Sequence, residues 1–233
     1  MTTIQPFQAT RWSRVIAAGA GDRPAMEELC RAYWFPLYAF VRRKGYPAAE
    51  AEDLVQGFFV LLLERESVAV ADARRGRFRT FLLATLTNHL ADEHARKMAA
   101  KRGGGKIVAL PGDSNRIWEA EPLTAASPEA EFDRRWALEV LDGTRRDLAN
   151  HYAASGKGAL FAALAPALDG GTPDQAALTA LALSPGAAKV ALHRLRNRWR
   201  DHLRQRVADT LGPGEVVEDE LADLLAAVRG TGV

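Results

Sequence analysis

The feature that most constrains this chain is the spacing of its apolar residues, which recur at steps of three and four in almost every periodic segment. This spacing places them on one face of an α-helix, whereas a half-buried strand would alternate at every second residue. No segment shows convincing strand alternation, so we predict an all-α fold. Two stripes are especially clear: Met26, Leu29, Cys30, Tyr33, Trp34, Leu37 and Phe40, and then Ala51, Leu54, Val55, Phe58, Phe59, Leu62 and Leu63.

Start and stop signals divide the chain into helices. Asp22 and Pro24 open a helix that the Gly45-Tyr46-Pro47 sequence ends, and the next helix runs from Ala48 to about Arg65. The basic segment that follows is helical as far as the glycines at 103–105. The remaining expected helices are a short one from Thr10 or Ser13 to Ala18, a helical set from Pro128 onward, a pair over 173–183 and 185–211, and a short acidic helix over 216–228.

Residues 103–127 differ from the rest, because they carry Gly, Pro, Asp and Ser with little periodicity. A stretch of this length without regular structure is unusual inside a compact domain. We therefore predict two small helical domains joined by a flexible linker. The expected boundaries are 1–102 for an N-terminal helical bundle, 103–127 for the linker, 128–212 for a C-terminal helix-turn-helix domain and 213–233 for an acidic tail.

The net charge of +2 conceals a strong segregation of charge. Arg74–Arg102 carries eight Lys and Arg residues against two acids, and Lys189–Arg206 carries seven against one. The tail from Asp209 to Arg229 carries six acids against one cation. Concentrated positive charge indicates a polyanionic partner, so nucleic acid is the first hypothesis. An ordinary solvated basic face is the alternative.

Two phenylalanines lie within the first basic segment. Phe78 and Phe81 stand among its cations, and flat rings beside a basic groove suit the stacking of unpaired bases. Their three-residue spacing is equally typical of a hydrophobic core. The sequence leaves both interpretations open.

The second basic segment has the outline of a helix-turn-helix, with a short helix, a tight turn and a longer basic helix. Ser184 is placed to cap the longer helix, and Pro185 occupies the first helical position, where its missing N–H costs nothing. Arginine suits both phosphates and guanine edges. The expected packing set of this helix is Val190, Leu192, Leu195, Trp199 and Leu203.

Enzymatic and metal-binding readings find little support. Cys30 is the only cysteine, which excludes an internal disulfide and a cysteine-built zinc site. His89, Glu93 and His94 lack the HExxH arrangement, and residues 101–106 lack the spacing of a phosphate loop. We expect no catalysis, cofactor or metal. No signal peptide or membrane span is apparent, so a cytoplasmic protein without membrane contact is expected.

Two motifs in the N-terminal half carry a family resemblance. One is Asp53-Leu54-Val55-Gln56-Gly57-Phe58-Phe59, and the other is Phe78-Arg79-Thr80-Phe81-Leu82 followed by Asn88 and Asp92. The chain resembles bacterial RNA polymerase sigma factors of the extracytoplasmic-function type, in the sigma-70 family. Their corresponding motifs read Asp-x-x-Gln-Glu-x-Phe and Phe-Arg-x-Trp-Leu with downstream Asn and Asp. The similarity covers about 80 residues, Asp22–Arg102, and Gly57 replaces the usual Glu.

The C-terminal half matches the family's recognition helix less fully. Ser184, Gly186, Lys189, Leu192, Arg194 and Arg196 agree with the pattern Ser-x-Gly-Thr-Val-Lys-Ser-Arg-Leu-x-Arg-Ala-Arg. Ala187 and Ala191 stand where the family has polar or charged residues. The preceding Gln175-Ala176-Ala177-Leu178 departs from the usual Glu-Ile-Ala.

The resemblance implies a sigma factor that directs core RNA polymerase to specific promoters and assists promoter melting. Its partners would be core RNA polymerase and promoter DNA, with an anti-sigma protein or a regulatory kinase left open. The implied polymerase-binding residues are Glu50, Asp53, Leu54, Gln56 and Phe59, where acidic side chains beside apolar ones suit a basic helical partner. The implied contacts to melted promoter are Arg77, Phe78, Arg79, Phe81, Asn88, Arg96, Lys97, Lys101 and Arg102. The implied duplex contacts are Ser184, Ala187, Lys189, His193, Arg194, Arg196 and Arg198.

Two questions remain open at the level of sequence. Ala187 and Ala191 motivate an alternative function, a sigma-like adaptor that binds protein and has lost duplex promoter recognition. The acidic tail has three possible roles: it could mask the basic recognition helix, bind a partner, or form a solvated helix.

Overall fold

We describe a computed structural model of the chain, covering residues 21–64, 77–102, 127–211 and 214–230. These residues are helical throughout, with turns between the helices and no strand, which confirms the all-α prediction. The helix expected before Ala18 and residues 103–126 of the expected linker lie outside the described residues. None of the described helices combines the length and apolar character needed to cross a membrane.

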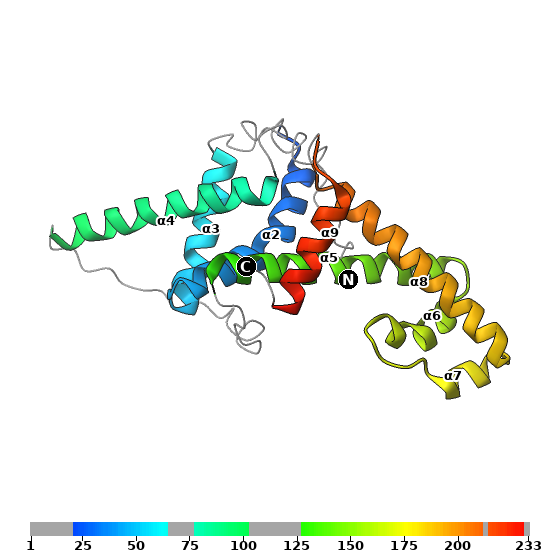
Figure 1. The fold of residues 1–233 in the computed structure, drawn as a ribbon. Helices are drawn as coiled ribbons and strands as arrows, with labels where there is room; N and C mark the ends of the chain where they lie inside the picture. Colours follow the sequence, from blue (N-terminus) through cyan, green and yellow to red (C-terminus); the bar gives the residue numbers. More distant parts are fainter. Residues whose placement is uncertain (1–20, 65–76, 103–126, 212–213, 231–233) are drawn as a thin grey trace. The chain divides into compact units, whose positions relative to one another are not determined.

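The helices follow the expected order along the chain (Figure 1). Asp22 caps the first described helix by accepting a hydrogen bond from the Ala25 N–H at 3.1 Å, and Gly45 lies beyond its end with a φ of +96°. Both predicted signals are confirmed. The elements are α2 (Arg23–Arg43), α3 (Ala48–Glu64), α4 (Phe78–Arg102), α5 (Pro128–Ala154), α6 (Gly158–Leu164), the 3-10 helix η3 (Ala165–Leu168), α7 (Gln175–Ala180), α8 (Pro185–Ala208) and α9 (Val217–Arg229).

The chain divides into two compact units, and the division falls within α5. The first unit contains the described residues up to 138 and those from 210 onward, and the second contains residues 139–209. This differs from the expected boundaries, because 128–138 and the acidic tail join the N-terminal helices. The side-chain contacts of these two segments, described below, explain why.

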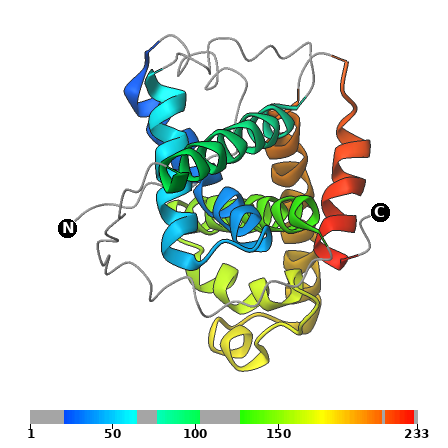
Figure 2. The same ribbon diagram turned by 90° about the vertical axis from the view of Figure 1, so that its left-hand side faces the viewer.

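Helices α2 and α3 lie against each other in the first unit (Figure 2). Aromatic rings from α2, α4 and α5 pack together in this unit. The ring centroid of Tyr33 lies 5.6 Å from that of Phe78, edge to face, and 6.4 Å from that of Phe132, in a stacked arrangement. Because Phe132 and Trp136 are buried here, the start of α5 belongs to this unit. The predicted apolar stripes supply much of the hydrophobic core, including Met26, Leu29, Tyr33, Leu37, Phe40, Ala51, Leu54, Val55, Phe58, Phe59 and Leu62.

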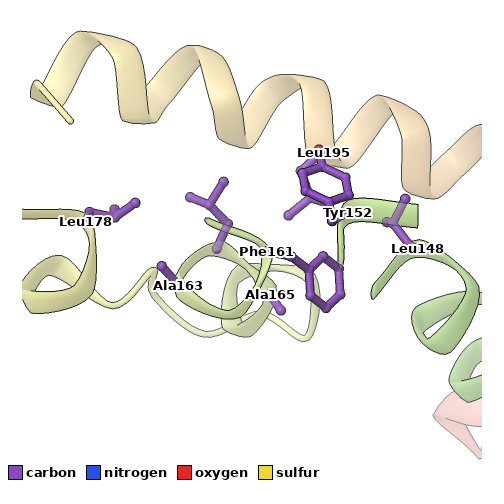
Figure 3. Close-up of a cluster of buried hydrophobic side chains, with 8 residues drawn as sticks. Leu148, Tyr152, Phe161, Ala163, Ala165, Leu178 and Leu195 are labelled. Atoms are coloured by element: carbon purple, nitrogen blue, oxygen red, sulfur yellow. The ribbon is translucent and has the colours of Figure 1, made fainter. Parts of the chain in front are cut away.

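The second unit packs α5, α6, η3, α7 and α8 around a compact apolar cluster (Figure 3). Burial of apolar side chains in this cluster is the main stabilising contribution available to so small a unit. Arg206 near the end of α8 is also buried and pairs with Asp147 of α5. The cluster consists of Leu148, Tyr152, Phe161, Ala163, Leu164, Ala165, Leu178 and Leu195.

The turn between α7 and α8 is set by two backbone hydrogen bonds. The N–H of Ala182 donates to the carbonyl of Thr179 at 2.9 Å, and the N–H of Leu183 donates to that of Leu178 at 3.2 Å. This pair of bonds defines a Schellman ending, in which the residue after the helix adopts the left-handed conformation. Ala182 has a φ of +53° and is the only described non-glycine residue with a positive φ.

Candidate nucleic-acid interface

Helix α8 presents a continuous polar face in the second unit. Leu195 is fully buried in the unit's hydrophobic core, and Leu192 and Trp199 pack partly against it. The opposite side of the helix, at the three- and four-residue steps that share a face, is exposed. It carries Lys189, His193, Asn197, Arg200 and Arg204.

The predicted cap of α8 is confirmed. The hydroxyl of Ser184 accepts a hydrogen bond from the N–H of Ala187 at 3.2 Å, and Pro185 occupies the first turn. Both capping residues are exposed. The positive end of the helix dipole therefore lies at the surface, where it favours an anion.

The predicted basic residues of α8 are all exposed but do not have equal freedom. Arg196 donates to the carbonyl of Ala167 at 3.4 Å, and Arg198 lies over the ring of Tyr152, 5.6 Å from its centroid. Within the described residues, Lys189 and Arg194 make no ion pair. These two side chains are the ones most available to a phosphate.

Val190 does not pack as predicted. Its side chain is 51% exposed, although it was expected among the packing residues of α8. Five residues before Leu195, it lies about 140° around the helix from the buried face. An exposed apolar side chain thus sits among the cations of α8.

The two phenylalanines at the start of α4 take part in the hydrophobic core. Phe78 is only 3% exposed, and Phe81, half-buried, stacks on it with ring centroids 5.9 Å apart. In this structure the Phe78 ring is enclosed by Tyr33 and Phe81, as the hydrophobic-core interpretation expects, and it is not open to a base. The three-residue spacing of Phe78 and Phe81 places two rings that pack on each other in the hydrophobic core.

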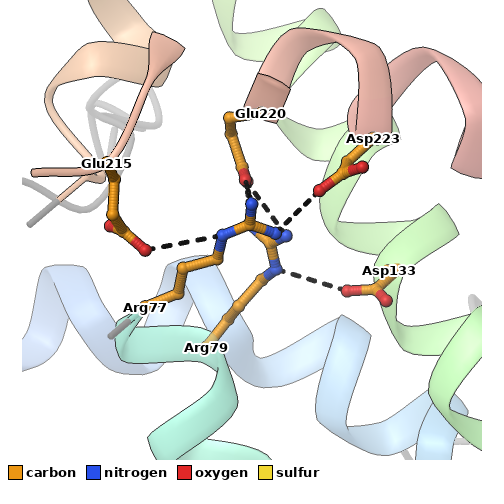
Figure 4. A network of polar contacts seen from close by, with 6 residues as sticks. All are labelled: Arg77, Arg79, Asp133, Glu215, Glu220 and Asp223. Carbon is orange, nitrogen blue, oxygen red and sulfur yellow. Dashed lines mark hydrogen bonds and ion pairs between the residues drawn. The ribbon is translucent and has the colours of Figure 1, made fainter. Parts of the chain in front are cut away.

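Arg77 and Arg79 are occupied by carboxylates of the same unit (Figure 4). Arg77 reaches Glu220 at 2.8 Å, Asp223 at 2.9 Å and Glu215 at 3.6 Å. Arg79 forms a two-pronged contact with Glu220 and lies 3.3 Å from Asp133 of α5. Four carboxylates thus surround two guanidinium groups, and we call these six residues the carboxylate clamp.

The interior of the carboxylate clamp is largely dry. Glu220 is 0% exposed, and Arg79 lies over the Trp136 ring, 4.4 Å from its centroid. Burial lowers the pKa of Arg79, against the opposing effect of Asp133, and burial raises the pKa of Asp133, against the effect of Arg79. Both shifts reflect the loss of water around groups that attract one another.

The other predicted melted-promoter residues are spread around α4. Asn88 and Arg96 are exposed, and Arg96 pairs with Glu93 three residues earlier. Lys97 pairs with Glu50 of α3 and lies about 180° around the helix from Asn88, so it belongs to another face. Lys101 and Arg102 end α4, and their side chains lie outside the described residues.

The predicted polymerase-binding helix, α3, has a narrow exposed stripe. Asp53 and Gln56 are exposed, and Val60, one turn further, is 46% exposed. Leu54 and Phe59 point into the hydrophobic core, where Phe59 stacks on Trp34 at 5.8 Å. Glu50 is half-buried and held by Lys97. Of the five predicted residues, Asp53 and Gln56 are the ones directly open to a partner.

Sequence reasoning missed the acidic half of the carboxylate clamp. The segregated charges of 74–102 and 209–229 were the available signal, but their pairing depends on how the bundle closes. Of the two histidines considered for a metal site, His89 is buried beside Gly57 and His94 is exposed. Across the described ranges, no group of three or more His, Cys, Asp or Glu residues is placed to hold a metal ion.

Comparison with known proteins adds no relative to this picture: no family model matches the chain, and no curated protein or solved structure is significantly similar to it.

Proposed function

We propose that this chain is a sigma factor that brings core RNA polymerase to specific promoters. The observation that carries the proposal is the exposed polar face of α8, opposite its apolar anchor Leu195. A short helix, a tight turn and a longer basic helix with its capped N-terminus exposed is the geometry with which helix-turn-helix proteins enter the major groove. The family resemblance of the sequence supports the same proposal.

In this proposal, α8 reads duplex DNA. Lys189 and Arg194 neutralise phosphates or contact guanine edges, while His193 and Asn197 offer further hydrogen-bonding groups. The exposed Val190 supplies an apolar surface of the kind that contacts a thymine methyl group. This contact surface compensates in part for Ala187 and Ala191, which motivated the adaptor alternative.

The first unit has the other two roles. The α3 stripe of Asp53, Gln56 and Val60 combines charge with an exposed apolar side chain, which suits a basic helical partner such as polymerase would provide. Asn88 and Arg96 on α4 are open to a separated DNA strand, where an amide can hydrogen-bond an unpaired base and a guanidinium can bind phosphate.

The division of labour can be tested with paired variants. We expect Arg194→Ala to weaken binding to duplex fragments selected by the protein by about 1 kcal/mol or more, and to leave polymerase binding intact. Arg145→Ala is the matched control, since it removes an arginine of α5 that pairs with Asp169 in the same unit. Equal losses for the two variants in a fluorescence-anisotropy titration would contradict the assignment of α8.

Polymerase binding is tested separately. The double variant Asp53→Ala with Gln56→Ala is expected to lose binding to core polymerase in a pull-down, whereas Glu27→Ala, an exposed acid of α2, is not. Retained polymerase binding by the double variant would remove α3 from the proposal. Polymerase binding without any duplex selection by the wild-type chain would favour the adaptor.

A further inference from the structure

The carboxylate clamp places the tail against residues that the sequence assigns to nucleic acid. Arg77 and Arg79 belong to the basic segment and lie at the start of α4, yet both are held by carboxylates, three of them from the tail. Guanidinium binds carboxylate and phosphate through the same planar fork. The tail therefore occupies these arginines with groups that resemble the phosphates of a DNA strand.

Helix α9 is attached through a few buried residues that are flanked by solvent-exposed ones. Leu224 is 1% exposed and Glu220 is fully buried, but Leu225 is 43% exposed and the Asp223 side chain is 59% exposed. Among the described helices, α9 has no extended close approach to any one of them. A buried carboxylate is tolerated only while its cationic partners stay in place. Electrostatic pairing therefore contributes much of what holds α9.

The charge balance of the clamp also favours exchange. Four carboxylates around two arginines leave an excess of negative charge, and Asp133 of α5 would remain to pair with Arg79 if α9 left. Of the tail carboxylates on Arg77, only that of Asp223 is well exposed, so a phosphate arriving at Arg77 would replace Asp223 first. Release of the tail would then begin at this most solvated contact.

We propose that α9 is an autoinhibitory helix, which holds Arg77 and Arg79 with carboxylates until a single DNA strand displaces it. This inference rests on the proposed function, in which α4 binds melted promoter. It adds a competitor within the chain. In the free protein the tail carboxylates hold Arg77 and Arg79, and the release of these arginines is coupled to binding of the DNA strand.

The test compares two variants of α9 that remove the same charge. Asp223→Asn breaks a rim contact to Arg77, whereas Asp219→Asn changes an exposed acid one turn away that makes no ion pair among the described residues. Fluorescein-labelled oligothymidine is titrated into each full-length protein at low and at moderate salt. Thermal unfolding of both variants close to the wild-type temperature is the control that neither substitution disturbs the fold.

We expect Asp223→Asn to bind the oligonucleotide about two- to fivefold more tightly than Asp219→Asn at low salt, the range expected for losing one partly exposed ion pair. The difference should shrink as salt screens the pair. In the wild type, saturating oligonucleotide should accelerate hydrogen exchange of the 217–229 amides while those of 23–43 stay protected.

Two other results are decisive. Equal affinities of the two variants, with unchanged exchange in α9 on binding, would overturn the autoinhibitory helix and leave the proposed function standing. Failure of every protein to bind oligothymidine at low salt would contradict the proposed role of α4 itself, and the inference with it.

Discussion

At the scale of single residues, two helices end in a residue with left-handed backbone conformation, which is a glycine in one case and an alanine in the other. Gly156 follows α5 with a φ of +69°, and Ala182 follows α7 with a φ of +53°. Glycine adopts this left-handed conformation at no steric cost, whereas a residue with a Cβ is penalised by about 1–2 kcal/mol. Ala182 therefore carries conformational strain in the turn that sets the direction of α8.

We predict that Ala182→Gly stabilises the protein by about 0.5–1 kcal/mol, the steric gain less the extra entropy of glycine in the unfolded chain. Gly156→Ala is the opposite control: a Cβ there would meet no atom within 4 Å, so its expected loss of about 1 kcal/mol is conformational alone. Urea unfolding of both variants measures the two changes. A loss of stability in Ala182→Gly would show that the strain is absent.

Cys30 provides a second residue-scale prediction. Burial raises the pKa of its thiol to about 11, so the reactive thiolate is scarce at neutral pH. At pH 8 we expect alkylation by iodoacetamide to be about two orders of magnitude slower than for an ordinary cysteine of pKa about 8.5, and to accelerate as the pH rises toward 11. The urea-unfolded protein is the control. Equal rates for folded and unfolded protein would refute the burial effect.

At the scale of elements, α3 contains an interior glycine that the fold does not require. A Cβ added at Gly57 would lie 3.8 Å from His89 Nε2, an ordinary van der Waals distance. Glycine within a helix costs about 0.5–1 kcal/mol relative to alanine. The packing of α3 on α4 therefore does not explain this residue.

We predict that Gly57→Ala raises the free energy of unfolding by about 0.5–1 kcal/mol, measured by thermal or urea unfolding. The adjacent exposed position supplies a control, since Gln56→Ala changes helix propensity very little. If Gly57→Ala instead lowers stability, the helix must be packed more tightly at His89 than the structure indicates.

The positions and ends of the helices were predicted better than the contacts that their side chains make. The stripes of α2 and α3, the caps at Asp22 and Ser184 and the turn before α8 follow from local periodicity and end signals, which depend on neighbouring residues. Val190 was misassigned and Phe78 was left undecided, because a three- or four-residue step does not say which face of a helix meets the hydrophobic core. That choice is made by distant elements, here α2 for Phe78 and α5 to α7 for α8.

At the scale of the whole molecule, the missed feature was a contact between residues more than 130 positions apart. Arg79 and Glu220 belong to segments whose opposite charges were evident, yet no local pattern pairs them. Likewise, the division within α5 depends on Phe132 and Trp136 packing against the N-terminal helices. Long-range pairing of this kind follows from the closed fold and not from the segment itself.

The two basic surfaces make a joint prediction about ionic strength. Counterion release lowers nucleic-acid affinity as salt rises, with a slope set by the number of phosphates neutralised. Arg194→Ala should reduce the slope for duplex binding by about one unit, and Arg96→Ala should reduce the slope for single strands without altering that for duplex. An identical effect of both variants on both substrates, in titrations over a series of salt concentrations, would contradict separate binding surfaces.

The central claim is that this chain gives core RNA polymerase promoter specificity, and run-off transcription tests it most directly. Purified core polymerase is supplied with a promoter library, with and without the full-length protein. We predict discrete new start sites that share an upstream motif and that weaken with Arg194→Ala but not with Arg145→Ala. An unchanged transcript pattern, despite a protein that is folded and binds polymerase, would contradict the claim.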